Sequence, residues 1–164
     1  MPGWEARWTV IEHIRDHVLP AALSLLPDRM DSPEADAMLL AIGLQESRFT
    51  HRRQVRGPAR GFWQFEVGGV SGVLRHTASA EHLRNACAAL HYAPAVADVH
   101  GALADNDTLA CVVARLLLWT LPSPLPRDAE GAWEQYIDAW RPGKPHRGTW
   151  DAFYAQAWAT LTGD

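Results

Sequence analysis

Apolar side chains recur every three or four residues through most of this chain, and that spacing restricts the fold to packed helices. Residues 149–161 show it most clearly, because their aromatic and aliphatic side chains fall on one face of a helix. No stretch alternates apolar and polar residues as a half-buried strand does, although residues 61–67 are a candidate for a short extended piece. We therefore expect a mainly α fold, with further helices over 4–19, 79–92, 107–120 and 128–140.

Several residues are expected to mark helix boundaries. Pro20 is expected to end the first helix, because proline lacks a backbone N–H and clashes with the preceding turn. Ser32 is a natural N-cap for a helix that begins at Pro33. Later helices have candidate N-caps at Ser79, Asp107 and Thr149.

The length of 164 residues fits one compact domain with its own core. Pro122, Pro124 and Pro126 form a stiff connector that is too short to separate two domains. Cys87 and Cys111 fall inside predicted helices, where burial as small apolar side chains is favoured over a disulfide. We expect residues 1–164 to form a single domain.

Charge and hydropathy exclude several classes of protein. The formal net charge of −4 gives no footprint for nucleic acid, so no nucleic-acid partner is expected. The most apolar segment, residues 111–121, is too short to span a bilayer, so no membrane insertion is expected. The first sixteen residues contain acids and tryptophans where a secretory signal needs a basic start and an apolar run. We expect no signal peptide.

One carboxylate interrupts an otherwise apolar helical face. The buried face of the helix that begins at Pro33 runs through Met38 and Ile42 to Glu46, and then to Phe49. The negative end of the helix dipole and an apolar wall both disfavour an ionised carboxyl group, so both raise its pKa. A general acid that holds its proton near neutral pH is one interpretation. A buried glutamate paired with a neighbouring arginine is the other.

The segments around Glu46 carry a recognisable pattern. Residues 46–49 read ESRF and, after a loop, residues 59–65 read ARGFWQF. These runs resemble the Glu-Ser-x-aromatic and Ala-x-Gly-x-x-Gln-apolar pattern of the lysozyme-like lytic transglycosylases, the family of soluble lytic transglycosylase and goose-type lysozyme domains. The resemblance covers about twenty residues and implies a lysozyme-like helical domain. It also implies that Glu46 is the catalytic acid/base and that the substrate-binding residues include Ser47, Gly61, Trp63 and Gln64.

The chain departs from the family pattern in three places. Pro58 stands where glycine is usual, Trp63 replaces methionine, and the family's later Tyr-Asn-Ala-Gly segment has no plain counterpart. The nearest candidate is the segment 136–145, where Tyr136, Trp140 and Gly143 could supply an aromatic wall and a turn at the sugar site. For both Tyr136 and Trp63, a place in the hydrophobic core is the competing interpretation.

The number of acids decides between two mechanisms. Most glycosidases use two carboxylates that flank the bond, and Glu66 is the nearest second acid. However, an acid that follows an apolar run is more typical of a solvated or helix-capping group. The resembled family uses a single glutamate, with the substrate's N-acetyl group stabilising C1 and the muramyl 6-hydroxyl closing a 1,6-anhydro ring. We therefore expect a cofactor-free lytic transglycosylase that cuts the MurNAc-β-1,4-GlcNAc bond. A hydrolytic muramidase and a non-catalytic virion structural or adaptor protein are the alternatives.

Expected partners and location follow from this resemblance. Peptidoglycan glycan strands are the expected partner, with other virion proteins as a further candidate. A missing leader fits a bacteriophage protein that lies in the virion, or in the host cytoplasm before delivery to the periplasm. The basic stretch 48–60 is expected to be a solvated loop, with contact to a polyanion as the alternative. His13 and His17 stand four residues apart without a third ligand, so no metal site is expected.

Overall fold

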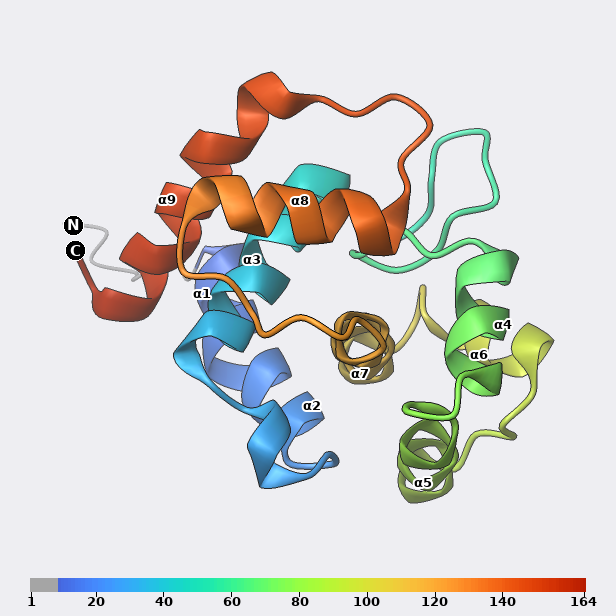
Figure 1. Ribbon diagram of the computed structural model, residues 1–164. Coiled ribbons are helices and arrows are strands. Elements are labelled where there is room, and N and C mark those ends of the chain that lie inside the picture. Colours follow the sequence, from blue (N-terminus) through green and yellow to red (C-terminus); the bar gives the residue numbers. More distant parts are fainter. Residues whose placement is uncertain (1–8) are drawn as a thin grey trace, which may run out of the picture.

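A computed structural model describes residues 9–164, which form helices joined by loops (Figure 1). A π-helical segment, Ile14–Val18, joins the first two helices, and a 3-10 turn covers Asp28–Met30. The described residues contain no strand. Near the expected extended piece at 61–67 there are two isolated β-bridges, which join Arg53 with Arg60 and Arg60 with Phe65. The mainly α prediction is therefore confirmed. The helices are α1 Val10–His13, α2 Leu19–Leu23, α3 Pro33–Ser47, α4 Val67–Arg75, α5 Ala80–Leu90, α6 Val96–Ala102, α7 Asp107–Trp119, α8 Ala129–Trp140 and α9 Arg147–Thr162.

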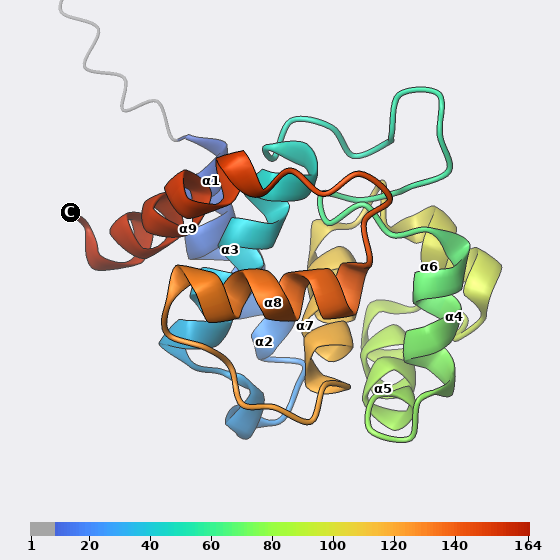
Figure 2. The same ribbon diagram turned by 45° about the horizontal axis from the view of Figure 1, so that its top comes forward.

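Helix α3 forms the centre of the fold. It begins as predicted, because the Ser32 side chain accepts a hydrogen bond from the Ala35 N–H at 3.1 Å. From Ala37 to Leu44 every residue is buried, including residues outside the predicted apolar face. Helix α9 packs along α3, and α7 and the π-helical segment also contact it (Figure 2). The carboxyl end of this rigid core helix carries Glu46.

Helix α7 lies between two groups of helices. Helices α4, α5 and α6 lie together on one side of it, and α3, α8 and α9 lie on the other (Figures 1 and 2). α7 contacts members of both groups, and its residues from Leu109 to Leu116 are buried. Its N-cap is Asn106, whose side chain accepts from the Leu109 N–H at 2.9 Å. The predicted cap, Asp107, is instead the first helical residue and pairs with Arg52.

Two other expected helix boundaries, at Pro20 and Thr149, are wrong, and the one at Ser79 is right but lacks the expected capping hydrogen bond. The helix does not end at Pro20, because the π-helical segment shifts the backbone hydrogen bonds and Pro20 falls in the first turn of α2. Ser79 occupies the N-cap position of α5, but its hydroxyl donates to the Val73 carbonyl at 2.7 Å. Helix α9 begins at Arg147, so Thr149 is inside it and donates to the Gln45 side chain at 2.9 Å. Residues 4–8 of the first predicted helix lie outside the described residues.

Cys87 and Cys111 are free and buried, which confirms their prediction as small core residues. Within residues 9–164, no helix combines the length and apolar character that a membrane span needs.

Candidate active site

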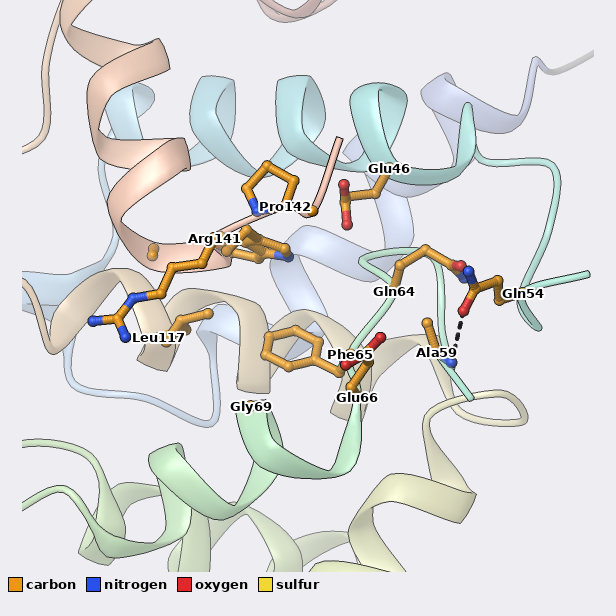
Figure 3. Close-up of a pocket in the computed structure, with 13 residues that line it drawn as sticks. Glu46, Gln54, Ala59, Gln64, Phe65, Glu66, Gly69, Leu117, Arg141 and Pro142 are labelled. Atoms are coloured by element: carbon orange, nitrogen blue, oxygen red, sulfur yellow. Dashed lines mark hydrogen bonds between the residues drawn. The ribbon is translucent and has the colours of Figure 1, made fainter. Parts of the chain in front are cut away.

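A cleft of about 560 Å³ lies between the end of α8 and the segment that leads into α4 (Figure 3). This volume falls within the range of small-ligand sites. Glu46 enters the cleft from the end of α3, and Glu66 enters it from the N-cap position of α4. In Figure 3 Glu46 lies in the upper part of the view and Glu66 lies below it. The cleft therefore contains two carboxylates in different surroundings.

Glu46 is half-buried in the last turn of α3. Burial raises its pKa from 4.5 to about 7, and a hydrogen bond from Tyr136 acts in the opposite direction. Within residues 9–164, no arginine or lysine lies within ion-pairing distance of Glu46. The alternative interpretation, a glutamate paired with an arginine, is therefore wrong for the described residues, and the pKa of Glu46 is raised as predicted.

Tyr136 brings α8 to the end of α3. Its hydroxyl donates a hydrogen bond of 2.7 Å to Oε2 of Glu46. The ring is buried and stacks on Trp150, with ring centres 5.1 Å apart and planes 9° from parallel. Of the two roles that the sequence left open for Tyr136, the ring takes the place in the core and does not form a wall of the cleft, while its hydroxyl reaches Glu46.

Trp140 and Gly143 both line the cleft, as expected for the segment 136–145. The indole N–H of Trp140 donates to the Trp63 carbonyl at 2.9 Å, which fixes the ring against the loop below α3. The Trp140 ring also packs against Phe65, with centres 5.6 Å apart. This side of the cleft is an aromatic wall.

The assignment of Trp63 to substrate binding is wrong. Trp63 has 0 % exposure, and its indole N–H donates to the Leu39 carbonyl of α3 at 2.8 Å. Its ring packs edge-on against Phe49. The backbone turns sharply at residues 61–64, with a positive φ of 54° at Gln64, so Trp63 lies in the core while its neighbour Gln64 lines the cleft. A tryptophan without exposed surface has no face to offer a sugar.

Ser47 and Gly61 also do not line the cleft. Ser47 is buried, donates to the Phe62 carbonyl at 2.6 Å and accepts from the Phe49 N–H at 3.1 Å. Gly61 has a φ of +78°, and a Cβ there would lie 3.0 Å from the Leu103 carbonyl oxygen. Only glycine adopts that backbone and fits that space without strain. Both residues therefore fix the loop that carries Gln64.

Gln64 lies at the cleft as predicted, and its amide donates to the Gly61 carbonyl at 2.8 Å. Sequence reasoning missed two further polar lining residues, Gln54 and Arg141. Gln54 accepts from the Ala59 N–H at 3.3 Å (Figure 3). Arg141 follows α8 directly and has a positive φ of 48°. Among the described residues that line the cleft, Arg141 is the one cation. Its position between Trp140 and Gly143, which were both candidates for the site, could have indicated that it lines the cleft.

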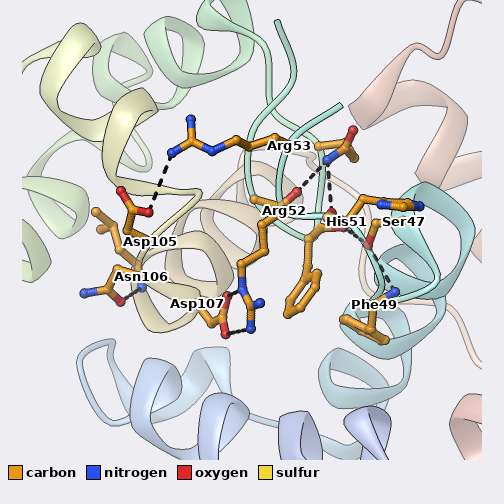
Figure 4. Close-up of polar contacts among 12 residues, drawn as sticks. Ser47, Phe49, His51, Arg52, Arg53, Asp105, Asn106 and Asp107 are labelled. Atoms are coloured by element: carbon orange, nitrogen blue, oxygen red, sulfur yellow. Dashed lines mark hydrogen bonds and ion pairs between the residues drawn. The ribbon is translucent and has the colours of Figure 1, made fainter. Parts of the chain in front are cut away.

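Acidic residues at and just before the start of α7 form ion pairs with arginines of the basic stretch 48–60 (Figure 4). Arg52 makes two contacts of 2.9 Å with Asp107, and its guanidinium carbon lies 4.3 Å from the centre of the Phe62 ring. Arg53 lies 3.7 Å from Asp105. With two of its charges already paired, this stretch is better explained as a structural loop than as a polyanion site.

Comparisons of this chain with protein-family models, curated proteins and solved structures return no match. In the part of the chain that the structure describes, no three His, Cys, Asp or Glu side chains lie close enough together to hold a metal ion. The functional interpretation therefore depends on the chemistry of the cleft and on the sequence pattern around Glu46.

Proposed function

We propose that this protein is a lytic transglycosylase that cuts the MurNAc-β-1,4-GlcNAc bond of peptidoglycan glycan strands. One observation carries the proposal: Glu46 lies in a cleft lined by an aromatic wall, and burial raises its pKa to about 7. A group with that pKa is protonated often enough to donate at neutral pH and ionised often enough to accept afterwards. The resemblance of residues 46–49 and 59–65 to the family pattern supplies the reaction and the substrate.

The proposed reaction uses Glu46 twice. The protonated carboxyl group gives its proton to the glycosidic oxygen, the bond from that oxygen to C1 breaks, and the substrate's N-acetyl oxygen stabilises C1. The Glu46 carboxylate then takes the proton of the muramyl 6-hydroxyl, and that oxygen attacks C1 to close the 1,6-anhydro ring. Tyr136 occupies Oε2 of Glu46, which leaves Oε1 as the oxygen that exchanges the proton.

The surroundings of Glu66 keep a hydrolytic muramidase as the second candidate. Glu66 lines the same cleft, so it could activate a water molecule opposite Glu46. It is exposed at the N-cap position of α4, and its side chain makes no capping hydrogen bond. Substrate assistance by the N-acetyl group would make such a second carboxylate unnecessary. We propose a bacteriophage setting for either activity, in the virion or in the host cell before delivery to the periplasm.

Digestion of purified peptidoglycan by the wild type, Glu46→Gln and Glu66→Gln tests the proposal. Glu46→Gln keeps the shape of the side chain and removes the proton donor, so release of soluble fragments should fall by ~10²–10⁴ while circular dichroism stays unchanged. Glu66→Gln should retain most activity. Equal losses in the two variants would favour the two-carboxylate hydrolase. Absence of digestion by the wild type would favour a non-catalytic virion structural or adaptor protein.

A further inference from the structure

A second cavity, of about 690 Å³, lies between the start of α3, the carboxyl end of α7 and the proline-rich connector 121–127. Three arginines line it, Arg29, Arg115 and Arg127, and they outnumber the single acid in its lining, Glu34. Glu34 is already paired with Arg127 at 3.0 Å. Among residues 9–164, neither Arg29 nor Arg115 lies within ion-pairing distance of a carboxylate. The cavity therefore contains unmatched positive charge.

Arg115 is the unusual member of this group. It is only 3 % exposed, and its one hydrogen bond within the described residues runs from Nε to the Met30 carbonyl at 2.8 Å. A guanidinium group has five N–H donors, and the terminal nitrogens of Arg115 are not among the fully buried, unpartnered polar atoms of the described residues. Burial lowers the pKa of Arg115 to about 10, so the side chain is still charged at neutral pH. Its remaining donors border a cavity that can admit an acceptor.

Nearby acids compensate this charge only in part. Asp31 and Asp36 act on Arg115 through space, but they line a separate depression beside Ser32. Burial raises the pKa of Asp36 to about 7, so this group carries only part of its charge at neutral pH. Asp31 is exposed to solvent, which screens its charge.

The cavity also has a flat apolar wall. The guanidinium carbons of Arg29 and Arg115 lie 5.6 Å and 5.5 Å from the centre of the Trp119 ring. Pro122 and Pro124 line the same cavity. An anion bound in the cavity would offset the positive charge of both arginines.

We propose that this cavity is a binding site for a small ligand that carries a carboxylate or phosphate group next to an apolar ring. The oxyanion accepts hydrogen bonds from the terminal nitrogens of Arg115, and Arg29 contributes a second positive charge at the exposed side. The apolar ring packs against Trp119 and the prolines of the connector. The site is independent of the cleft at Glu46, because Leu117 faces the cleft while Arg115 and Trp119 face this cavity on another side of α7.

Titration of the full chain with phenyl phosphate, benzoate, inorganic phosphate and neutral benzyl alcohol, followed by ¹H–¹⁵N NMR, tests the proposal. Phenyl phosphate or benzoate should shift amide signals of residues 115–125 in a saturable way, and benzyl alcohol should not. The stronger of the two anions identifies the preferred headgroup, and inorganic phosphate shows whether the headgroup alone suffices. No saturable binding of either aromatic anion, or equal binding of benzyl alcohol, would overturn the proposal.

Three variants locate the binding. Arg115→Met keeps the apolar stem and removes the buried charge, so the dissociation constant should rise at least ~10-fold, the effect of losing a hydrogen bond to a charged group. Arg29→Gln should weaken binding less, and Arg84→Gln, at an exposed position on α5, is the matched control and should leave it unchanged. Should Arg115→Met fail to fold, Arg29→Gln and Trp119→Leu carry the test. Unaltered affinity in every folded variant at the cavity would assign the binding elsewhere.

Discussion

Glu46 and Tyr136 change each other's acidity. Burial raises the pKa of Tyr136, and the neighbouring Glu46 charge raises it further, so the phenol remains a hydrogen-bond donor at any pH at which the protein works. In return, the donated hydrogen bond favours the ionised form of Glu46 and holds the pKa of that carboxyl below the value that burial alone would give. The proposed acid is therefore adjusted by one hydroxyl group.

This coupling predicts the direction of a pH shift. A general acid must be protonated, so kcat/KM on peptidoglycan should fall as pH rises through about 7. Tyr136→Phe removes the hydrogen bond that favours the carboxylate, so the pKa of Glu46 should rise and the falling limb should move to higher pH. Rates measured between pH 5 and pH 9 check this. A limb that stays in place or moves to lower pH would show that Tyr136 does not control the acidity of Glu46.

The burial of Trp63 predicts a stability effect without a binding effect. Trp63→Leu removes a large core side chain and leaves the Leu39 carbonyl without its donor, so unfolding should become easier by ~2–4 kcal/mol. Trp158→Leu, at a half-buried position on α9, should cost less. Chemical denaturation measures both variants. Weaker binding of a GlcNAc oligomer by Trp63→Leu, with unchanged stability, would contradict the core position of Trp63 and support a role in substrate binding.

The sequence predicts where a single side chain lies when that residue is part of a regular helix, because the helical spacing determines which face the side chain occupies. Glu46 follows the α3 spacing, and its proximity to the cleft was predictable for that reason. Residues 61–64 form a turn, so the side to which Trp63 or Gln64 points depends on positive φ angles at Gly61 and Gln64 that no periodic pattern encodes. The reach of the Tyr136 hydroxyl to Glu46 spans 90 positions in the chain and required the fold.

Among the secondary-structure elements, α6 stabilises the loop 58–65, which forms one side of the cleft, through hydrogen bonds from His100. Nε2 of His100 lies 3.0 Å from the Pro58 carbonyl and 3.1 Å from the Phe65 carbonyl. Both partners are acceptors, so this nitrogen carries the proton and donates to both. One histidine thus joins the two ends of the segment that contains Gln64.

His100→Leu should release this loop. Loss of the two hydrogen bonds should lower the free energy of unfolding by about 1–2 kcal/mol. The amide hydrogen of Arg60 should also exchange faster with solvent, because its acceptor, the Phe65 carbonyl, is no longer held by His100. His82→Leu on α5 is a control, because the His82 ring makes no hydrogen bond to a backbone carbonyl among the described residues. Unchanged exchange of the Arg60 amide hydrogen in His100→Leu would mean that His100 does not stabilise this loop.

The sequence predicted the long helices but neither α4 nor α6. Helix α4 contains Gly68, Gly69 and Gly72, and glycine in a helix interior costs about 1 kcal/mol relative to alanine. Helix α6 has 7 residues, too few for its apolar spacing to be distinct. The two helices pack on each other and bury Val70, Val73 and Val99, so tertiary contacts stabilise helices that local propensity does not specify.

For the whole molecule, two half-buried carboxyl groups predict how stability depends on pH. Burial raises the pKa of Asp36 and of Glu46 to about 7, from 3.8 and 4.5, so the folded state binds more protons than the unfolded chain between these limits. This stability is fully present below about pH 4 and is lost as pH rises through about 7. The melting temperature should therefore be lower at pH 8 than at pH 5.

A double variant separates this effect from other ionisations. Asp36→Asn with Glu46→Gln removes both groups, so its melting temperature should change less between pH 5 and pH 8 than that of the wild type. Asp16, whose pKa is lowered by its hydrogen bond to Arg15, titrates below this window and does not contribute. A double variant with the full wild-type slope would place the pH dependence in other groups.

The masses of the fragments released from purified peptidoglycan give the most direct test of a single-acid cleft at Glu46. Transfer of the muramyl 6-hydroxyl to C1 produces 1,6-anhydro ends, which are lighter by one water than the reducing ends that hydrolysis leaves. We predict anhydro-muropeptides from the wild type and from Glu66→Gln, and almost none from Glu46→Gln. Reducing ends as the main product, or anhydro products that persist in a folded Glu46→Gln variant, would contradict the proposed reaction at this residue.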